Sequence, residues 1–407
     1  MNAGLRLTCD LVAAGVALGW LQRALSAMIH LPRIPDVRLP EYDAQPMGSL
    51  TVVVPARDEG ANIEATLRSL LAQDLERLQI VAVNDRSTDA TGVLMEQLAS
   101  EQRESESDSQ RASEGQEQRP RLKVIHVTEL PAGWVGKTHA MARAAEASES
   151  DWLLFTDGDV VFAPDALRRA LVCAEKTRTD HIVLTPTMEI RQWDEGVILG
   201  YFQAVSLWVG RPWRIPDPKA KHDYAGMGAF NMVRREAYDR IGGFTALRME
   251  VLEDVRLGIL LKRAGFTQRM VFGRDLVRIH WATGAKGLLS VVMKNMFAVF
   301  RFQPVLLLLG CVAMLLFCVA PVVWLFAGGA MQWAGVITAA AVALTYRAYG
   351  RYSGISAWYG LLFPVAALMM VFALLRSTWV TWRQGGVRWR GTFYTLAELR
   401  RNVGPFL

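Results

Sequence analysis

DWLLFTDGDVVFAP, residues 151–164, is an apolar run interrupted by two aspartates one residue apart. Asp157 and Asp159 stand where the run would otherwise continue, and Val160 and Val161 resume it. Two carboxylates this close repel each other, so such a pair usually needs a cation between them or a chemical role. The stretch therefore predicts a buried strand that ends on a functional pair of aspartates.

The residues on either side alternate between strand and helix patterns. Apolar runs at residues 49–55, 78–85, 122–127 and 152–157 are each followed by a segment with helical periodicity. Near-continuous apolar strands that alternate with helices predict an α/β fold with a doubly wound, mostly parallel sheet. In such sheets, ligands bind outside the carboxyl ends of the strands.

Polar clusters follow three of these predicted strands. The first strand ends in PARDEG, the second in NDRSTDAT and a later one in TDGDV. Taken singly, each acidic residue could be a turn residue or a helix cap. Because all three clusters fall at the same edge of one sheet, we expect one site there, built from Arg57, Asp58, Glu59, Asp85, Asp157 and Asp159.

A D-x-D pair at a strand end has at least two chemical uses. In phosphatases of the haloacid-dehalogenase type, the first aspartate is a nucleophile and the second a general acid. Alternatively, the pair holds Mg²⁺ or Mn²⁺, which takes one or two carboxylates together with the phosphate oxygens of a nucleotide-sugar. The late position of Asp157 in the chain and the valines after Asp159 favour the second use.

The chain also predicts a membrane protein. Hydrophobic residues make up 52% of it, and residues 302–346 and 352–375 contain no charged side chain. A spanning helix needs about 20 apolar residues, so the first stretch fits two helices that turn at AGGAMQ (327–332) and the second fits one more. Residues 1–30 are interpreted as a membrane anchor rather than a cleaved signal peptide.

The charged residues and the cysteines argue against nucleic-acid binding, a disulfide framework and a zinc site. The net charge of +6 comes with arginines beside the apolar segments, which favours a membrane surface and not nucleic acid. The four cysteines have no metal-ligand spacing, so neither a disulfide framework nor a zinc site is predicted. Residues 101–119 carry acids and arginines with almost no aliphatic side chain, and they are predicted to be a flexible insertion.

Five stretches resemble the successive motifs of family-2 inverting glycosyltransferases of the GT-A fold. They are VVVPARDEGANIEATLRSLLAQ, VAVNDRSTDATGVL, FTDGDV, GAFNMVRREAYDRIGGF and LEDVRLGILLKRAGF, in the family's order between Leu50 and His280. With this resemblance the phosphatase interpretation falls away. PAGWVGKTHAM resembles the GW-x-GK stretch of membrane glycosyltransferases that act on lipids, such as hopanoid- and carotenoid-associated ones.

The resemblance implies a role for each matching residue. Pro55, Arg57 and Glu59 would line the nucleoside pocket, and Asp85 would contact the base or ribose. Mg²⁺ or Mn²⁺ would be bound by Asp157 and Asp159, with His280 as a further ligand, and Lys137 would reach phosphate. Asp254 would be the general base, with Glu253 beside it. QGGVRWRGTFY departs by one residue from the Q-x-x-R-W of processive synthases and ceramide glucosyltransferases, leaving Arg388 and Trp389 as candidates for acceptor or diphosphate contact.

The predicted organisation is a membrane anchor (1–30), a glycosyltransferase domain (46–285), an interfacial amphipathic helix (286–303), a transmembrane region (304–376) and a basic tail (377–407). The predicted enzyme is a hexosyltransferase that moves a sugar from a nucleotide-sugar to a lipid or lipid-linked acceptor at the cytoplasmic face of the cell (inner) membrane. Two alternatives are a processive polysaccharide synthase, for which the spans are few, and a catalytically idle scaffold. Pro364, in the middle of residues 352–375, favours a segment that is re-entrant or docks at the interface and returns the tail to the cytoplasm. The alternative is a plain third span with an external tail.

Overall fold

The computed structural model describes residues 3–112, 121–300, 302–389 and 392–397. Of residues 105–112, 292–296, 298, 387–389, 392 and 394 it describes the backbone alone. The chain divides into two compact units. We call residues 35–187 and 214–280 the sheet unit, and residues 3–34, 188–213 and 281–397 the helical unit.

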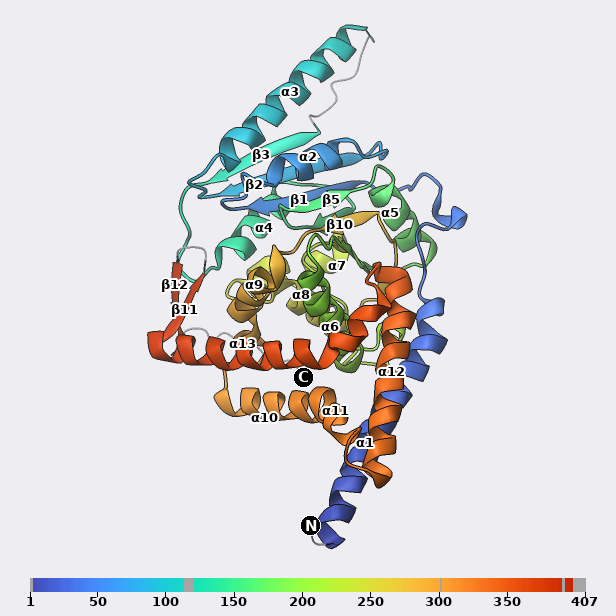
Figure 1. Cartoon of the computed structure of the whole chain (residues 1–407). Helices are drawn as coiled ribbons and strands as arrows, with labels where there is room; N and C mark the ends of the chain where they lie inside the picture. Colours follow the sequence, from blue (N-terminus) through green and yellow to red (C-terminus); the bar gives the residue numbers. More distant parts are fainter. Residues whose placement is uncertain (1–2, 113–120, 301, 390–391, 398–407) are drawn as a thin grey trace. The chain divides into compact units, whose positions relative to one another are not determined.

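The sheet unit is built on a seven-stranded sheet with the order β3-β2-β1-β4-β8-β6-β9. Figure 1 shows β3, β2 and β1 side by side at one end of this order. All neighbouring strands are parallel except at β8, which is antiparallel to both β4 and β6. The strands are β1 (Leu50–Ala56), β2 (Leu78–Asp85), β3 (Leu122–Val127), β4 (Trp152–Phe155), β6 (His181–Leu184), β8 (Asn231–Arg234) and β9 (Gln268–Val271). A smaller sheet has the order β5-β10-β7, formed by β5 (Val160–Phe162), β10 (Val277–Ile279) and β7 (Thr187–Met188). The predicted α/β fold with a mostly parallel sheet is confirmed.

The core of the sheet unit lies between the large sheet and its helices. Every residue of β1 is buried, as the continuous apolar run predicts for a central strand. Val53, Val81 and Phe155 form one cluster with Leu257 and the alanine-rich face of α4. The helices are α2 (Ile63–Leu71), α3 (Thr91–Ala112), α4 (Gly136–Glu146), α5 (Ala166–Lys176), α7 (Arg235–Arg240) and α8 (Glu253–Arg263).

The prediction of a flexible insertion from residue 101 was wrong for its first part. Helix α3 continues to Ala112, and residues 113–120 lie outside the described part of the chain. Glu, Gln and Arg are good helix formers, so an exposed helix can continue without burying an apolar face. Gln97 donates a hydrogen bond to Glu101 at 3.1 Å, and Arg68 forms an ion pair with Glu101 at 3.1 Å.

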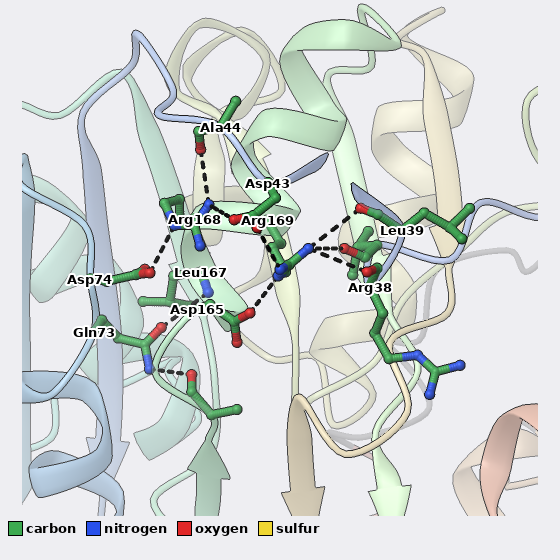
Figure 2. Close-up of polar contacts among 12 residues, drawn as sticks. Arg38, Leu39, Asp43, Ala44, Gln73, Asp74, Asp165, Leu167, Arg168 and Arg169 are labelled. Atoms are coloured by element: carbon green, nitrogen blue, oxygen red, sulfur yellow. Dashed lines mark hydrogen bonds and ion pairs between the residues drawn. The ribbon is translucent and has the colours of Figure 1, made fainter. Parts of the chain in front are cut away.

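Two arginines of α5 fasten the segment that precedes β1 (Figure 2). Arg168 forms ion pairs with Asp43 at 2.7 Å and Asp74 at 2.8 Å. Arg169 pairs with Asp165 and donates to the carbonyl oxygens of residues 37–39. These contacts hold the start of the sheet unit against α5.

The helical unit contains α1 (Ala3–His30), α6 (Trp193–Val209), α9 (Gly284–Val299), α10 (Pro304–Met314), α11 (Ala320–Trp324), α12 (Gly329–Ser353) and α13 (Phe363–Gln384). A π-helical turn, Leu315–Val319, joins α10 to α11, and a hairpin of β11 (Gly386–Trp389) and β12 (Thr392–Thr395) follows α13. Helices α1 and α12 lie side by side, with Ala13 and Ala17 packed on Ala334 (Figure 1).

Within the described part of the chain, three helical segments are long and apolar enough to cross a membrane: Ala3–Arg33, Pro304–Trp324 and Ala357–Gln384. The predicted turn near residues 327–332 corresponds to the break between α11, which ends at Trp324, and α12, which begins at Gly329. Helix α12 is not one of these three segments, so the second predicted span stays a prediction. The predicted place of Pro364 in the middle of a helix was wrong. Pro364 lies in the first turn of α13, where its missing N–H would have no helical partner in any case.

Candidate active site

Parallel pairing brings the polar ends of three strands to one edge of the large sheet. Leu50 pairs with both Leu78 and Trp152, so β1, β2 and β4 start level and end at the same edge. The loops that follow β1 and β2 are hydrogen-bonded to each other. Asp58, which has a positive φ of 55°, accepts the N–H of Thr88 at 2.7 Å. The predicted meeting of these clusters at one edge is confirmed.

Lys137 joins two motifs that lie about a hundred residues apart in the sequence. Its Nζ is 2.6 Å from Oδ1 of Asp157 and 2.6 Å from Oε1 of Glu253. Burial would lower the pKa of Lys137, but the charges of Asp157, Glu253 and Asp254 outweigh burial and raise it. The lysine therefore stays charged and holds the two carboxylates together.

Asp159, the second aspartate of the D-x-D pair, has a carboxylate whose negative charge is less compensated by nearby positive charge than that of Asp157. Its Oδ1 is buried and has no hydrogen-bond partner within the described residues. Burial, together with the charges of Asp157 and Glu59, raises the pKa of Asp159 to about 7. A divalent cation beside it would supply the missing positive charge, so the residues present fit a metal ion.

The surroundings of the pair limit the kind of metal site. Among the residues that the structure describes, no three His, Cys, Asp or Glu side chains gather as a group that could hold an ion. The geometry thus gives no support to His280 as a third protein ligand beside Asp157 and Asp159. An ion such as Mg²⁺, which binds through one or two carboxylates and substrate phosphates, needs no such cage.

Glu253 and Asp254 occupy the first turn of α8. Oδ1 of Asp254 accepts the N–H of Val255 at 2.8 Å, and the helix N-terminus favours negative charge there. Burial nevertheless raises the pKa of both carboxyl groups, and the charge of Lys137 opposes that shift. A buried carboxylate with a raised pKa is a better proton acceptor than an ordinary surface aspartate.

Two glycines before β8 leave room for this group. A Cβ at Gly228 would lie 2.7 Å from Oδ2 of Asp157, and one at Gly226 would lie 2.3 Å from the main-chain oxygen of Asp254. Asn231 of β8 donates to that same oxygen at 3.3 Å. Any larger side chain at either glycine would displace a carboxylate residue of the site.

The second strand places Asp85 beside the start of α4. Asp85 is buried and receives two hydrogen bonds from Arg86, at 2.8 Å and 3.1 Å. A Cβ on Gly136 would lie 2.4 Å from Oδ2 of Asp85, so only glycine allows this approach. Pro55 is buried in β1, and Arg57 and Glu59 follow it half-buried.

Comparison with known proteins identifies the activity class. Residues 51–256, half of the chain, match Glycosyl transferase family 2. The chain belongs to glycosyl transferase family 2. The matched range contains all the site residues described above, and the predicted glycosyltransferase activity is confirmed at this level.

One solved structure supports the fold of this family-2 protein, and a second shows a weaker similarity. A mannosyltransferase from Pyrobaculum calidifontis, solved with GDP-Man and Mn²⁺, is 17% identical, with coverage of 91% of this chain and 99% of that chain and a TM-score of 0.51. TarS residues 1–349 from S. aureus, solved with UDP, are 14% identical, with coverage of 83% and 92% and a TM-score of 0.37. A search of curated proteins finds no match. The sheet unit has the GT-A fold.

Some site features of this glycosyltransferase were not predicted from the sequence, and others involve side chains outside the described part of the structure. The link between Lys137 and Glu253 was not predicted, because a lysine after a Gly-Trp turn points equally well to phosphate. The two closely spaced glycines of the GMG sequence before β8 could have indicated a close approach at Gly226 and Gly228. The backbone of Arg388 and Trp389 forms part of β11, but their side chains lie outside the described part, so their role stays a prediction.

Proposed function

We propose that this family-2 enzyme is a membrane-bound, metal-dependent inverting glycosyltransferase that moves a sugar from a nucleotide-diphosphate sugar to a lipid or lipid-linked acceptor. The observation that carries the proposal is the buried, unpartnered oxygen of Asp159 beside Asp157 and Lys137. A group with this charge pattern suits a bound cation and the diphosphate of a donor. The Mn²⁺ and GDP-Man of the Pyrobaculum enzyme agree with such a donor and ion.

Each charged residue has a role in this reaction. The acceptor oxygen attacks the anomeric carbon while the bond from that carbon to the diphosphate breaks. Asp254 takes the proton of the acceptor hydroxyl, and the nucleoside diphosphate leaves. Asp157 and Asp159 would hold the divalent ion, which supplies charge compensation for the leaving diphosphate. Lys137 keeps Glu253 and Asp157 in place and adds positive charge beside the same group.

The helical unit supports a lipid or lipid-linked acceptor. Three segments are apolar and long enough to span a membrane, and large apolar side chains on α1, α10 and α13 are exposed. An exposed apolar surface of this extent is typical of a protein that contacts lipid. Helix α9 has the amphipathic pattern of a helix in the membrane interface, where an acceptor's head group would lie.

The experiment uses the full chain in phosphatidylcholine nanodiscs. Nucleotide-sugars with different bases serve as donors, and dioleoylglycerol, ceramide and polyprenyl phosphate serve as acceptor probes. We expect transfer to one of these probes that stops with chelator and returns with Mg²⁺ or Mn²⁺. Asp157→Asn and Asp159→Asn should each abolish turnover, whereas Asp36→Asn, at a half-buried ion pair with Arg38 far along the sequence, should not. Full activity in chelator would overturn the metal dependence.

Orientation in the membrane is tested separately. Arginines and lysines flank the sheet unit along the chain, so the positive-inside bias places it in the cytoplasm, together with the tail. Thr395 is exposed, whereas Ser377 is buried, so a single cysteine at Thr395 is the better probe. Labelling of intact cells by a membrane-impermeant thiol reagent would place the tail outside and contradict this topology.

A further inference from the structure

The chain enters the helical unit from the sheet unit at two internal points. One crossing follows Thr187 and the other follows His280. The first helix after each crossing is α6 and α9, respectively. On the side of the sheet unit the two crossings are already tied, because the N–H of Asp275 donates to Oγ1 of Thr187 at 2.8 Å. The corresponding tie on the other side is made by two acidic residues of α6.

Glu195 caps two helices at once. It is fully buried, and its Oε2 accepts the N–H of Arg191 at 2.8 Å, just before α6. Its Oε1 accepts the N–H of Gly284 at 2.8 Å, at the first residue of α9. Both oxygens of this carboxylate are therefore used by main-chain donors of different segments.

Asp194 adds a second hydrogen bond to the same helix end. Its Oδ2 accepts the N–H of Ala285 at 2.8 Å. Its Oδ1 is buried and has no hydrogen-bond partner among the described residues. Asp194 thus holds α9 with one oxygen, whereas Glu195 needs both oxygens to hold α6 and α9 together.

The N-terminus of a helix favours carboxylate partners of this kind. The first N–H groups of a helix lack helical partners, and its N-terminus carries a partial positive charge. Two carboxylates at the N-terminus of α9 satisfy both needs. Gly284 has a φ of 67°, in the left-handed region, so the backbone turn into α9 favours glycine there. The start of α9 is fixed to α6 within a few residues of His280.

We propose that Asp194 and Glu195 are positioning residues that hold α9 for transfer to the lipid acceptor. The inference rests on the proposed function, in which α9 is the helix beside the acceptor's head group. Donor chemistry depends on residues of the sheet unit, so it does not need this cap. Loss of the cap should reduce transfer to lipid while leaving hydrolysis of the donor by water unchanged.

The two side chains offer a matched pair of variants. Glu195→Gln removes one charge and leaves an amide group where Arg191 or Gly284 needs an acceptor, so one of the two hydrogen bonds is lost. Asp194→Asn also removes one charge, but its single carbonyl oxygen can still accept from Ala285 because the other oxygen has no partner. A difference between these variants therefore reports hydrogen bonding and not charge.

The test measures transfer and donor hydrolysis on the same nanodiscs, with the acceptor probe that the wild type glycosylates. Glu195→Gln should raise the acceptor KM about tenfold with donor hydrolysis unchanged, a change equivalent to ~1.4 kcal/mol. Asp194→Asn should stay close to the wild type. Hydrogen exchange of the peptide that contains Gly284 and Ala285 should be faster in Glu195→Gln and unchanged in Asp194→Asn.

The outcomes separate the two proposals. A wild type without donor turnover would contradict the proposed function itself. If the wild type is active, two results would overturn the positioning role. In the first, Glu195→Gln shows faster hydrogen exchange at Gly284 and Ala285 but the same ratio of transfer to hydrolysis as the wild type. In the second, its hydrogen exchange there is unchanged. Should Glu195→Gln not fold, Asp194→Ala, which removes only the bond to Ala285 at a half-buried position, must itself lower the transfer ratio.

Discussion

The two units of the chain differ in what they expose. In the sheet unit, the only large hydrophobic side chains exposed among the described residues are Leu39, Met47 and Val93. In the helical unit such side chains run along whole helices, for example on α13, where they are Val365, Leu368, Phe372, Leu375, Trp379, Val380 and Trp382. A surface of this kind is typical of a protein that contacts lipid, as the proposed function requires of the helical unit.

The buried polar groups differ in the same way. The sheet unit buries charges in pairs, such as Lys137 with Glu253 and Arg256 with Glu250 at 3.0 Å. The helical unit buries mainly uncharged groups, and Thr338 and Thr345 each bond a carbonyl oxygen one turn earlier in α12. Polar groups in hydrocarbon must be satisfied within their own segment, so the contrast agrees with the proposed membrane location of the helical unit. Glu195 is an exception in the helical unit, and its partners are helix ends.

The largest expected effect falls on the chemistry of the sheet unit. Asp254→Asn should lower transfer by about 10²–10⁴-fold, because an amide cannot take the acceptor's proton. Nucleotide affinity, measured by calorimetric titration of the full chain in nanodiscs, should stay nearly unchanged. A large loss of nucleotide binding would assign Asp254 to the donor site instead.

Breaking a buried charge pair tests how the sheet unit tolerates charge. Lys137→Met leaves Glu253 buried without its cation, which should cost about 3–5 kcal/mol of stability. The thermal unfolding midpoint of the full chain in detergent measures this loss. Lys137→Met combined with Glu253→Gln should recover part of it, since no unpaired carboxylate then remains at Glu253. Equal midpoints for the single and double variants would contradict the pairing.

Replacing one exposed apolar side chain by lysine in each unit tests whether the two surfaces face water or hydrocarbon. Leu368→Lys on α13 places a charge on an apolar face and should cost about 3 kcal/mol if that face lies in hydrocarbon. Val93→Lys on α3, at a side chain that is 71% exposed, should change stability by less than about 0.5 kcal/mol. Thermal unfolding in nanodiscs measures both. Similar small effects would mean that α13 faces water.

A buried histidine makes the stability of the sheet unit depend on pH. Burial lowers the pKa of His181 to about 4, below its ordinary value of 6.5, so the folded state binds fewer protons than the unfolded state between these values. The stability contributed by neutral His181 is complete above pH 6.5 and is lost as pH falls toward 4, by at most about 3 kcal/mol.

Unfolding midpoints between pH 4 and 7 test this dependence. His181→Gln keeps a hydrogen-bonding group toward Asn231 but does not titrate, so its midpoint should vary less with pH. An unchanged slope in His181→Gln would contradict the assignment.

The smallest effect is expected from shortening α3. Deleting residues 102–118 leaves a linker of a few residues before β3, a common length for a helix-to-strand connection. It removes exposed contacts such as that of Arg103 with Glu96, which is worth at most about 1 kcal/mol. Activity and the unfolding midpoint should stay near those of the wild type. A large loss of folding would show that the removed helix packs against another surface.

Local patterns in the sequence were sufficient for the class of the fold and for the residue types of the site. Continuous apolar strands require a sheet covered on both faces, and polar residues after them mark its ligand-binding edge. For this reason Asp85, Asp157 and Asp159 could be predicted together. Long uncharged runs likewise indicated the helices between residues 302 and 375, because their signal is composition and needs no partner.

The tertiary structure decided which side chains are partners. Lys137, Asp157 and Glu253 come from segments far apart in the chain, and only the strand order and the glycine loop before β8 bring them together. The tie between α6 and α9 depends in the same way on two separate crossings into the helical unit. Hydrophobic periodicity indicates which face of a segment is buried, but not which other segment packs against that face. The sequence alone was therefore enough to predict the helices and strands, whereas the tertiary structure decided which charged residues of different segments form pairs.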